Sequence, residues 1–522
     1  MEDDSIYFSS ANALADHLGY ILPSVPSQPV ATKYPILYPW LLSWVWRWNP
    51  SFPANLNVAA ILTLAFGMAF LVCSFIFLRG LEGIGDSEAL LLTFLTAVHP
   101  IVLMYSSMVM SDLPFAALAL AAMLTADRAM RPEASGAKAA SCAGLTGLAI
   151  LMRVLGVPIA AGILAAALAR RAWRQAAIFC AVLIPFGGVI LHGAMLARPS
   201  LPMGHGTGLL GPGFATEWTY YTSYIGYWKI SVPNTHILWE MLKNNALVVL
   251  FSPSSYTLFA LLTKPTTLNK ALMFLVTAGV FAGIVRQAKA GGWKPIHFAL
   301  PFFLAVILFW NYPDTNRFLF PFLPLFVAGL WSEVKHLLAL IAKAFRESQQ
   351  GSEKAIALAL GLAVVALVCA LAWNYVLGTR NILAMGRDRS NLLAEKREAY
   401  QWIAGNTSTG DVVIAYEDAS LYLYSGRQSM RPVTFPTSGF YETAYLQESL
   451  TQMEDVAHGV GARYWLISND DFSVEWTDAL TKGREREREL EQGFSGVFQS
   501  KNGRVRIYKF PCRGDSKNQP CG

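Results

Sequence analysis

Long apolar runs follow one another through most of this chain, and each can cross the hydrocarbon core of a bilayer, which takes about 20 residues. Charged residues stand mainly between the runs and make up only 15% of the 522 residues, whereas soluble domains carry about 25%. The pattern predicts a polytopic α-helical membrane protein. We expect spans at residues 57–79, 88–105, 112–130, 141–152 with 155–169, 175–197, 270–286, 295–310, 317–334 and 354–377.

Two stretches are ambiguous. Residues 141–169 are interrupted around Arg153, which is compatible with two short helices or with one kinked helix and a re-entrant turn. Residues 198–269 form a long loop whose apolar patch at 245–262 is either an interfacial helix or another span.

The sidedness of the loops follows from their basic residues, which are concentrated in alternate short loops. We assign the basic loops to the cytoplasm by the positive-inside rule. The N-terminal loop, residues 106–111, 198–269 and 311–316, and everything after 378 then lie outside. Because no span precedes residue 1, we expect that a first helix is missing from this sequence; the alternative is that the short N-terminal segment crosses the membrane unaided. The basic residues behind the net charge of +6 are scattered over these loops and form no cluster with aromatic residues. This distribution argues against nucleic-acid binding.

The chain divides into four predicted parts. Residues 1–56 form a first extracytoplasmic loop, 57–380 the membrane domain, 390–510 a soluble domain and 511–522 a tail. In the soluble domain strands and helices alternate, which predicts a small, partly parallel α/β sheet. Its expected elements are helices at 391–405, 442–460 and 476–491, strands at 411–416 and 464–468, and two closing strands. Cys512 and Cys521 in the tail could pair if they face an oxidising compartment.

Two adjacent carboxylates, Asp3 and Asp4, open the first outer loop. Neighbouring carboxylates at a membrane surface can hold a divalent cation, or one can act as a base that the other orients. Acidic residues also simply suit a non-cytoplasmic loop. An apolar helical stripe would fix the position of Asp3 and Asp4, which favours a functional role for them over a merely acidic loop. The stripe consists of Tyr7, Ala11, Leu14, Ala15 and Leu18.

Lys33 and Tyr34 stand in the segment TKYPILYPWLL, whose prolines oppose a regular helix. A lysine at headgroup level suits a phosphate. An equally good interpretation is a lysine that snorkels beside an aromatic belt, formed here by Trp40, Trp44, Trp46 and Trp48.

Three further charged residues lie near the same predicted face. Asp112 follows Ser111 at a helix start and could serve only the helix dipole, but it lies on the side of Asp3 and Asp4. Arg153 between apolar stretches needs a partner, and could clamp a lipid phosphate or pair within the bundle. Arg317 opens a late span and could reach the same pocket. Together these groups suit an anionic, lipid-linked substrate.

The order and sidedness of these motifs resemble the membrane-embedded GT-C glycosyltransferases that use polyprenyl-phosphate sugars. Within that class the sequence resembles the family 39 enzymes, which include the protein O-mannosyltransferases and the lipid A aminoarabinose transferase. The motifs that carry it are DDSIYFSSANALADHLGY, KYPILYPWLL, SSMVMSDLPF, LMRVLGVPIAAGIL and NRFLFPFLPLF.

The resemblance implies roles for individual residues. Asp4, with Asp3 beside it, matches the essential acid of the first outer loop, and Asp112 matches a second acidic position. Lys33, Arg153 and Arg317 match the basic residues that bind the lipid phosphate, with Tyr34 next to Lys33 in the same site. A span normally precedes the acidic loop in this family, and this sequence departs from that pattern.

The implied enzyme transfers a sugar, with inversion, from a polyprenyl-phosphate donor to an extracytoplasmic lipid, glycan or protein acceptor. It would be embedded among the lipids of a bacterial cytoplasmic membrane, with the active site and the C-terminal domain outside. Mg²⁺ or Mn²⁺ on Asp3, Asp4 and Asp112 is compatible with the acid cluster, but some such enzymes work without a metal, so the cofactor stays open. A transporter or lipid flippase explains the spans equally well but predicts inverted repeats and mid-membrane charges. A membrane-anchored binding protein that acts through residues 390–510 is a third interpretation.

Overall fold

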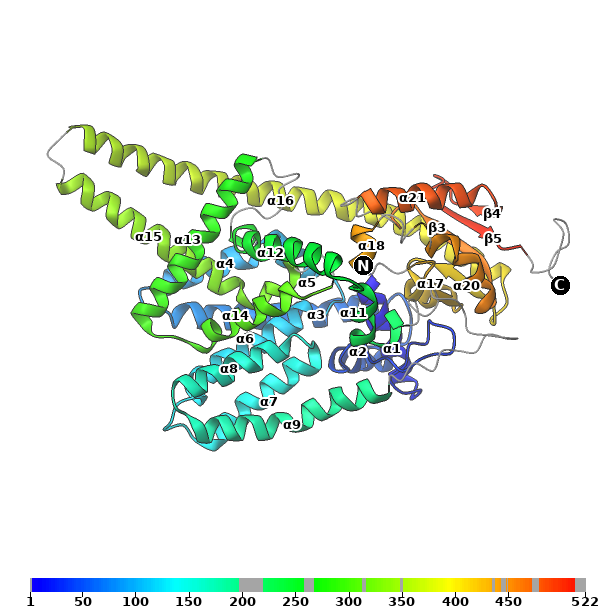
Figure 1. Cartoon of the computed structure of the whole chain (residues 1–522), viewed down its shortest axis with the longest axis horizontal. Helices are drawn as coiled ribbons and strands as arrows, with labels where there is room; N and C mark the ends of the chain where they lie inside the picture. Colours follow the sequence, from blue (N-terminus) through cyan, green and yellow to red (C-terminus); the bar gives the residue numbers. More distant parts are fainter. Residues whose placement is uncertain are drawn as a thin grey trace.

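The computed structural model describes residues 2–196, 219–257, 267–311, 316–347, 351–433, 437–442, 447, 449–471 and 478–511. It shows a helical bundle and a small C-terminal sheet (Figure 1), so the predicted class, a polytopic helical protein with a C-terminal α/β domain, is confirmed. Residues 312–315 of the predicted outer turn, and Cys512 and Cys521 of the predicted tail, lie outside the described residues. The helices up to the long α16 are α1 (Glu2–Ala15), α2 (Leu37–Trp48), α3 (Leu56–Arg79), α4 (Asp86–Ala97), α5 (Pro100–Ser106), α6 (Asp112–Ala129), α7 (Gly136–Met152), α8 (Gly156–Ala169), α9 (Trp173–Leu196), α11 (Tyr224–Ser231), α12 (Thr235–Thr257), α13 (Thr267–Gly291), α14 (Pro295–Leu308), the 3₁₀ helix η1 (Asn316–Phe322), α15 (Leu323–Glu347) and α16 (Gly351–Asn406).

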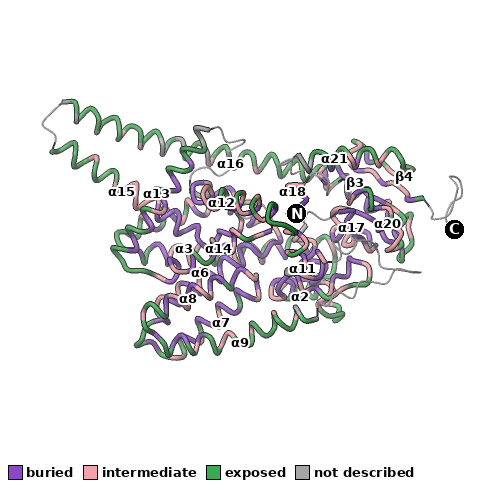
Figure 2. The backbone as a smooth tube through the Cα atoms, in the orientation of Figure 1, coloured by how far each residue is buried: buried purple, intermediate pink, exposed green. Residues whose placement is uncertain are grey.

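The alanine-rich helix α6 lies at the centre of the bundle and packs against α3, α7, α8, α14 and η1. Figure 2 shows this region largely buried, in contrast to the exposed hairpin of α15 and α16. Small residues let membrane helices approach closely. At the α8–α14 contact, a Cβ on Gly162 would lie 2.2 Å from the Cα of Ala299, so this crossing requires glycine.

Four described helical stretches are long and apolar enough to cross a membrane: Leu56–Arg79, Trp173–Gly193, Lys270–Gly291 and Arg317–Glu347. The bent pair α4 and α5 would make a fifth. The predicted spans at 141–152, 155–169 and 295–310 correspond to the shorter apolar helices α7, α8 and α14. The protein is therefore a multi-pass membrane protein in which shorter helices pack among full-length spans.

Several elements predicted from the sequence differ in detail from those in the structure. The expected span at 88–105 is bent by 62°, because Pro100 has no N–H to continue the helical ladder and His99 caps α5 by accepting from the N–H of Ile101 at 3.3 Å. The ambiguous stretch around Arg153 is two helices, since Arg153 has an extended backbone (φ −152°, ψ 141°) at the end of α7. The predicted loop 198–269 contains α11 and α12, and its apolar patch continues α12 as far as Thr257.

Helix α16 corrects two predictions at once. A span at 354–377 and a separate helix at 391–405 were expected, but one continuous helix of 56 residues covers both. At 1.5 Å per residue it is roughly 84 Å long. It extends from the hairpin with α15 to the C-terminal sheet (Figure 1), so one continuous helix joins the two parts of the chain.

The C-terminal unit is a five-stranded mixed sheet in the order β2-β1-β3-β5-β4. Strand β1 pairs in parallel with β2 and β3, while β5 runs antiparallel to β3 and β4. The last turns of α16 cover one face through Ala399, Tyr400 and Ile403. Of the predicted helix at 442–460, the described residues 447 and 449–451 are helical, and after a turn at 452 the chain continues in α20. The elements are β1 (Val412–Ala415), α17 (Asp418–Ser425), β2 (Gln428–Met430), α18 (Thr437–Tyr441), α20 (Met453–Gly459), β3 (Ala462–Ser468), α21 (Asp478–Glu491), β4 (Ser495–Gln499) and β5 (Val505–Lys509).

The C-terminal unit contacts the N-terminal segment through α17, which packs against α1. The hydroxyls of Ser5 and Ser420 share a hydrogen bond of 2.6 Å. The backbone N–H of Ser429 donates to the carbonyl of Ser24 at 2.7 Å. The first turn of α1, which carries Asp3 and Asp4, therefore lies between the bundle and the sheet.

Candidate active site

Helix α1 places Asp3 and Asp4 in its first turn, where carboxylates interact favourably with the helix dipole. Tyr7, Phe8 and Ala11 on the same helix are buried. Trp46 of α2 holds α1 further, because its indole N–H donates to the carbonyl of Phe8 at 3.0 Å. The predicted apolar stripe therefore does anchor the acidic turn.

Asp3 is bound by two groups from distant segments. Arg317 of η1 contacts its Oδ2 at 2.7 Å, and the hydroxyl of Tyr34 donates to its Oδ1 at 2.7 Å. Partial burial alone would raise the pKa of Asp3, but the Arg317 guanidinium and the Tyr34 hydrogen bond outweigh it and lower the pKa. The lowered pKa favours the ionised form of Asp3, whose carboxylate holds Arg317 in place.

Asp112 and Arg153 form the second ion pair, with Nη1 and Oδ1 2.6 Å apart. The Asp112 side chain is 1% exposed and that of Arg153 is 11% exposed. Ser111 is the N-cap residue of α6, but its side chain makes no capping hydrogen bond. Its hydroxyl shares a hydrogen bond of 3.0 Å with the hydroxyl of Tyr7. The start of α6 is thus tied both to α1 and to the break between α7 and α8.

Phe318 joins the two ion pairs. The guanidinium carbon of Arg153 lies 4.9 Å from its ring centroid, and that of Arg317 lies 5.4 Å from the same point. Cations are attracted to aromatic faces within about 6 Å. Four charged residues from separate parts of the sequence thus form one cluster: Asp3, Asp112, Arg153 and Arg317.

Asp4 differs from its neighbour. The backbone N–H of Ser5 donates to its Oδ1 at 2.9 Å. Burial raises its pKa, and the negative charge of Glu417, just before α17, raises it further. A carboxylate with a raised pKa is the better proton acceptor near neutral pH.

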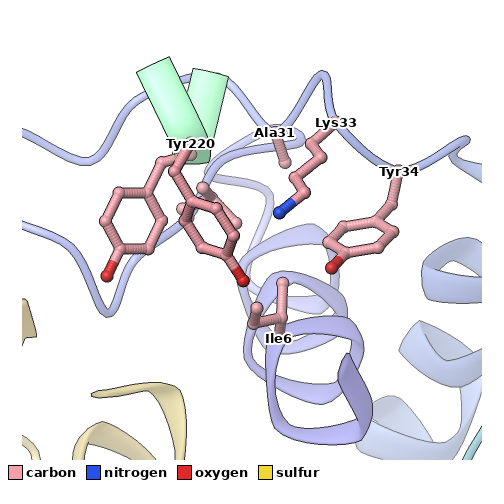
Figure 3. Close-up of a pocket in the computed structure, with 7 residues that line it drawn as sticks. Ile6, Ala31, Lys33, Tyr34 and Tyr220 are labelled. Carbon is pink, nitrogen blue, oxygen red and sulfur yellow. The ribbon is translucent and has the colours of Figure 1, made fainter. Parts of the chain in front are cut away.

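Lys33 lies beside this cluster, in a small pocket lined by Ile6, Leu22, Ala31, Lys33, Tyr34, Tyr220 and Tyr221. Figure 3 shows its ammonium directed between the rings of Tyr220 and Tyr34, whose centroids lie 3.3 and 5.5 Å from Nζ. Lys33 is only 6% exposed. It is therefore enclosed by aromatic rings, and the interpretation as a lysine that snorkels into the interface is wrong.

Tyr34 connects the two regions, because its ring faces Lys33 while its hydroxyl binds Asp3. Two other buried tyrosines pack here edge to face: the ring of Tyr7 lies 4.9 Å from that of Tyr34 and 5.2 Å from that of Tyr38. Sequence reasoning missed Tyr38 and Tyr220 as site residues. The only local signal for Tyr38 is that it follows Tyr34 by four residues, and Tyr220 carries none.

The predicted metal ligands do not form a metal site among the described residues, where no group of three or more His, Cys, Asp or Glu side chains converges. Asp3 and Asp112 each bind a guanidinium. A divalent cation on these carboxylates would have to displace both arginines, so the observed side chains do not fit a metal. The arrangement offers instead a carboxylate with a raised pKa beside fixed cations, which suits proton transfer next to an anionic group.

Comparison with known proteins supports the fold. No family model matches the chain, and no curated protein matches it in sequence. The crystal structure of ArnT from Cupriavidus metallidurans bound to undecaprenyl phosphate is similar, with a TM-score of 0.54 and 14% identity over 98% of this chain and 93% of ArnT. The archaeal oligosaccharyltransferase AglB from Archaeoglobus fulgidus, in complex with an inhibitory peptide and a dolichol-phosphate, gives 0.51 and 14% over 99% of this chain and 71% of AglB.

These likenesses establish the fold. The chain is a multi-pass membrane protein with the GT-C fold, and the fold that the sequence motifs predicted is confirmed.

Proposed function

We propose that this protein is a membrane glycosyltransferase that moves a sugar from a polyprenyl-phosphate donor to an extracytoplasmic acceptor. The observation that carries the proposal is the single cluster of two ion pairs, Asp3–Arg317 and Asp112–Arg153, next to Asp4. The similar ArnT and AglB structures contain undecaprenyl phosphate and dolichol-phosphate, which supports a polyprenyl-phosphate ligand.

Asp4 is the best candidate for the general base. Burial and the negative charge of Glu417 raise the pKa of Asp4, which suits a proton acceptor. Asp4 would take the proton from the acceptor as the acceptor atom attacks the anomeric carbon. The bond from that carbon to the phosphate oxygen breaks on the opposite face, and its electron pair leaves with the polyprenyl phosphate. A single displacement of this kind inverts the anomeric configuration.

Arg153, Arg317 and Lys33 would stabilise the charge that develops on the departing phosphate, which in such reactions is usually the largest catalytic contribution. Asp112 and Asp3 hold the two arginines in place through contacts of 2.6 and 2.7 Å. The cations are therefore fixed before the reaction begins. The phosphate leaves as an anion and needs no proton, so a separate general acid is unnecessary.

The location of the reaction is also part of the proposal. We place the protein in a bacterial cytoplasmic membrane, with the acidic turn of α1 and the C-terminal unit on the outer side. Residues 1–56 would be an outer loop, 57–380 the membrane domain, 390–510 the outer domain and 511–522 a tail. The acceptor would be a lipid, a glycan or a protein.

The experiment uses membranes that contain the full chain and a polyprenyl-phosphate sugar labelled in the sugar. We expect label to leave the organic-soluble donor as polyprenyl phosphate forms. Asp4→Asn should lower the rate by about 10²- to 10⁴-fold, the usual contribution of a general base. Asp16→Asn, an exposed carboxylate just after the same helix, is the matched control and should leave the rate unchanged. Full turnover by Asp4→Asn would remove Asp4 from the mechanism.

A further inference from the structure

Lys396, in the C-terminal part of α16, is a buried cation that two carboxylates of the C-terminal unit hold in place. Its Nζ lies 2.9 Å from Oε1 of Glu417 and 2.9 Å from Oδ1 of Asp470. The Lys396 side chain is only 4% exposed. Because a buried charge is stable only while it is paired, Lys396 and these carboxylates fix one another's positions.

Two more titratable groups belong to this surrounding. Asp471 accepts from the backbone N–H of Ser468 at 2.7 Å, and its carboxylate also acts on Lys396. Tyr400, one helical turn after Lys396 on α16, lies near the same three carboxylates. Lys396 is thus the cation that keeps Glu417, Asp470 and Asp471 from repelling one another.

Glu417 connects this cluster to the acidic turn of α1. It stands directly before α17, three residues ahead of Ser420. The hydroxyl of Ser420 shares the 2.6 Å hydrogen bond with the hydroxyl of Ser5, which directly follows Asp4. Charged side chains from α16, the start of α17 and α1 therefore follow one another as Lys396, Glu417 and Asp4.

The groups that face Asp4 come from several segments. Burial raises the pKa of Asp4, the positive amino terminus lowers it, and the negative charges of Glu417 and Asp3 raise it further. Tyr38 of α2 also lies close to Asp4. Among the charged groups, Glu417 is the one that the C-terminal unit contributes.

We propose that Lys396 is a positioning residue that fixes the carboxylate of Glu417 beside Asp4, and that the C-terminal unit thereby takes part in the transfer reaction. The inference rests on the proposed function, in which Asp4 is the base. Without Lys396, the charge of Glu417 would lie near those of Asp4, Asp470 and Asp471 with no cation between them. Glu417 would then take up a proton or turn its side chain, already 25% exposed, further into solvent.

Either response withdraws negative charge from Asp4 and lowers its pKa, so Asp4 stays ionised at lower pH. The acidic side of the kcat/KM pH profile should therefore move to lower pH when Lys396 is replaced. A direct effect of the lost positive charge on Asp4 would move it in the opposite direction. The sign of the shift separates the two possibilities.

The test measures the pH profile of kcat/KM for the labelled polyprenyl-phosphate sugar with the full chain in membranes. Lys396→Met should move the acidic side of the profile to lower pH by roughly half to one unit, within the usual spread of carboxyl pKa values in folded proteins. Lys396→Arg, which keeps the charge, should restore most of the original profile. Arg397→Gln removes the neighbouring exposed cation of α16, which contacts Tyr424, and is the control that should leave the profile in place.

A double variant shows whether Lys396 acts through Glu417. In a Glu417→Gln background, Lys396→Met should cause no further shift. If Lys396→Met alone does not fold, Asp470→Asn is added to it, because this removes a second carboxylate left without its cation, and the profile is compared with that of Asp470→Asn alone. A purely structural role would reduce the amount of folded enzyme without moving the profile. The proposal is overturned by a profile that stays in place, moves to higher pH, or still moves in the Glu417→Gln background.

The outcome can be told apart from that of the proposed function. If Asp4→Asn is inactive and Lys396→Met leaves the profile in place, the positioning role fails and the base assignment stands. Full turnover by Asp4→Asn would overturn both.

Discussion

Replacement of Arg153 by glutamine should destabilise the protein strongly, because it leaves a buried carboxylate without its cation. Asp112 lies 2.6 Å from Arg153, and its side chain is 1% exposed, so water cannot replace the guanidinium. Removal of one partner of a buried ion pair typically costs about 3–5 kcal/mol. The lost stacking of Arg153 on Phe318 adds to the effect.

The matched control is the pair Arg79–Asp86, which has nearly the same separation, 2.8 Å, but side chains that are 60% and 71% exposed. Arg79→Gln should cost about 0–1 kcal/mol, as exposed pairs do. The measurement is equilibrium unfolding in mixed detergent micelles, followed by tryptophan fluorescence. Adding Asp112→Asn to Arg153→Gln should recover much of the loss, because the uncompensated charge is then gone.

The reasoning is refuted if Arg153→Gln costs no more than Arg79→Gln. It is also refuted if the double variant is less stable than Arg153→Gln by the full cost of Asp112→Asn alone, because the two residues would then be energetically independent.

Two further predictions concern the base and the helix packing. Since burial and the charge of Glu417 raise the pKa of Asp4, kcat/KM for the donor should fall with decreasing pH already above the usual carboxylate range. Glu417→Gln should lower that pKa and shift the acidic side of the kcat/KM pH profile to lower pH. A pH profile that does not shift would contradict this prediction. A Cβ on Gly283 would lie 1.8 Å from the carbonyl oxygen of Gly329, so Gly283→Ala should push α13 from α15 and cost about 1–3 kcal/mol in the same unfolding assay. Gly361→Ala, where a Cβ meets open space, should cost nothing measurable.

The candidate site shows what local sequence can reveal. Asp3, Asp112, Arg153 and Arg317 are notable in the sequence because charge is costly in or near a membrane and must be paired or functional. That physical cost makes such residues visible without a structure. The sequence does not reveal the partners, since Asp3 binds a residue 314 positions away.

Because the sequence does not reveal contact partners, it also did not reveal several residues of the site. Tyr38 and Tyr220 look like ordinary interfacial aromatics in a chain with 20 tyrosines. Arg431 lies in a polar stretch of the sequence, where an arginine is ordinary and gives no sign of a special role. Only the packing of α17 and β2 against the N-terminal segment brings Arg431 to the ring that also faces Lys33.

The amino-acid sequence by itself determined the membrane class, most helix positions and the alternation of strands and helices after residue 390, because hydrophobic periodicity is a local property of the chain. Tertiary structure decided which carboxylate pairs with which arginine and where the C-terminal unit packs against the acidic turn of α1. It also showed that α16 is one continuous helix. These depend on contacts between residues far apart in the sequence, whose energies are set by burial and distance rather than by neighbouring residues.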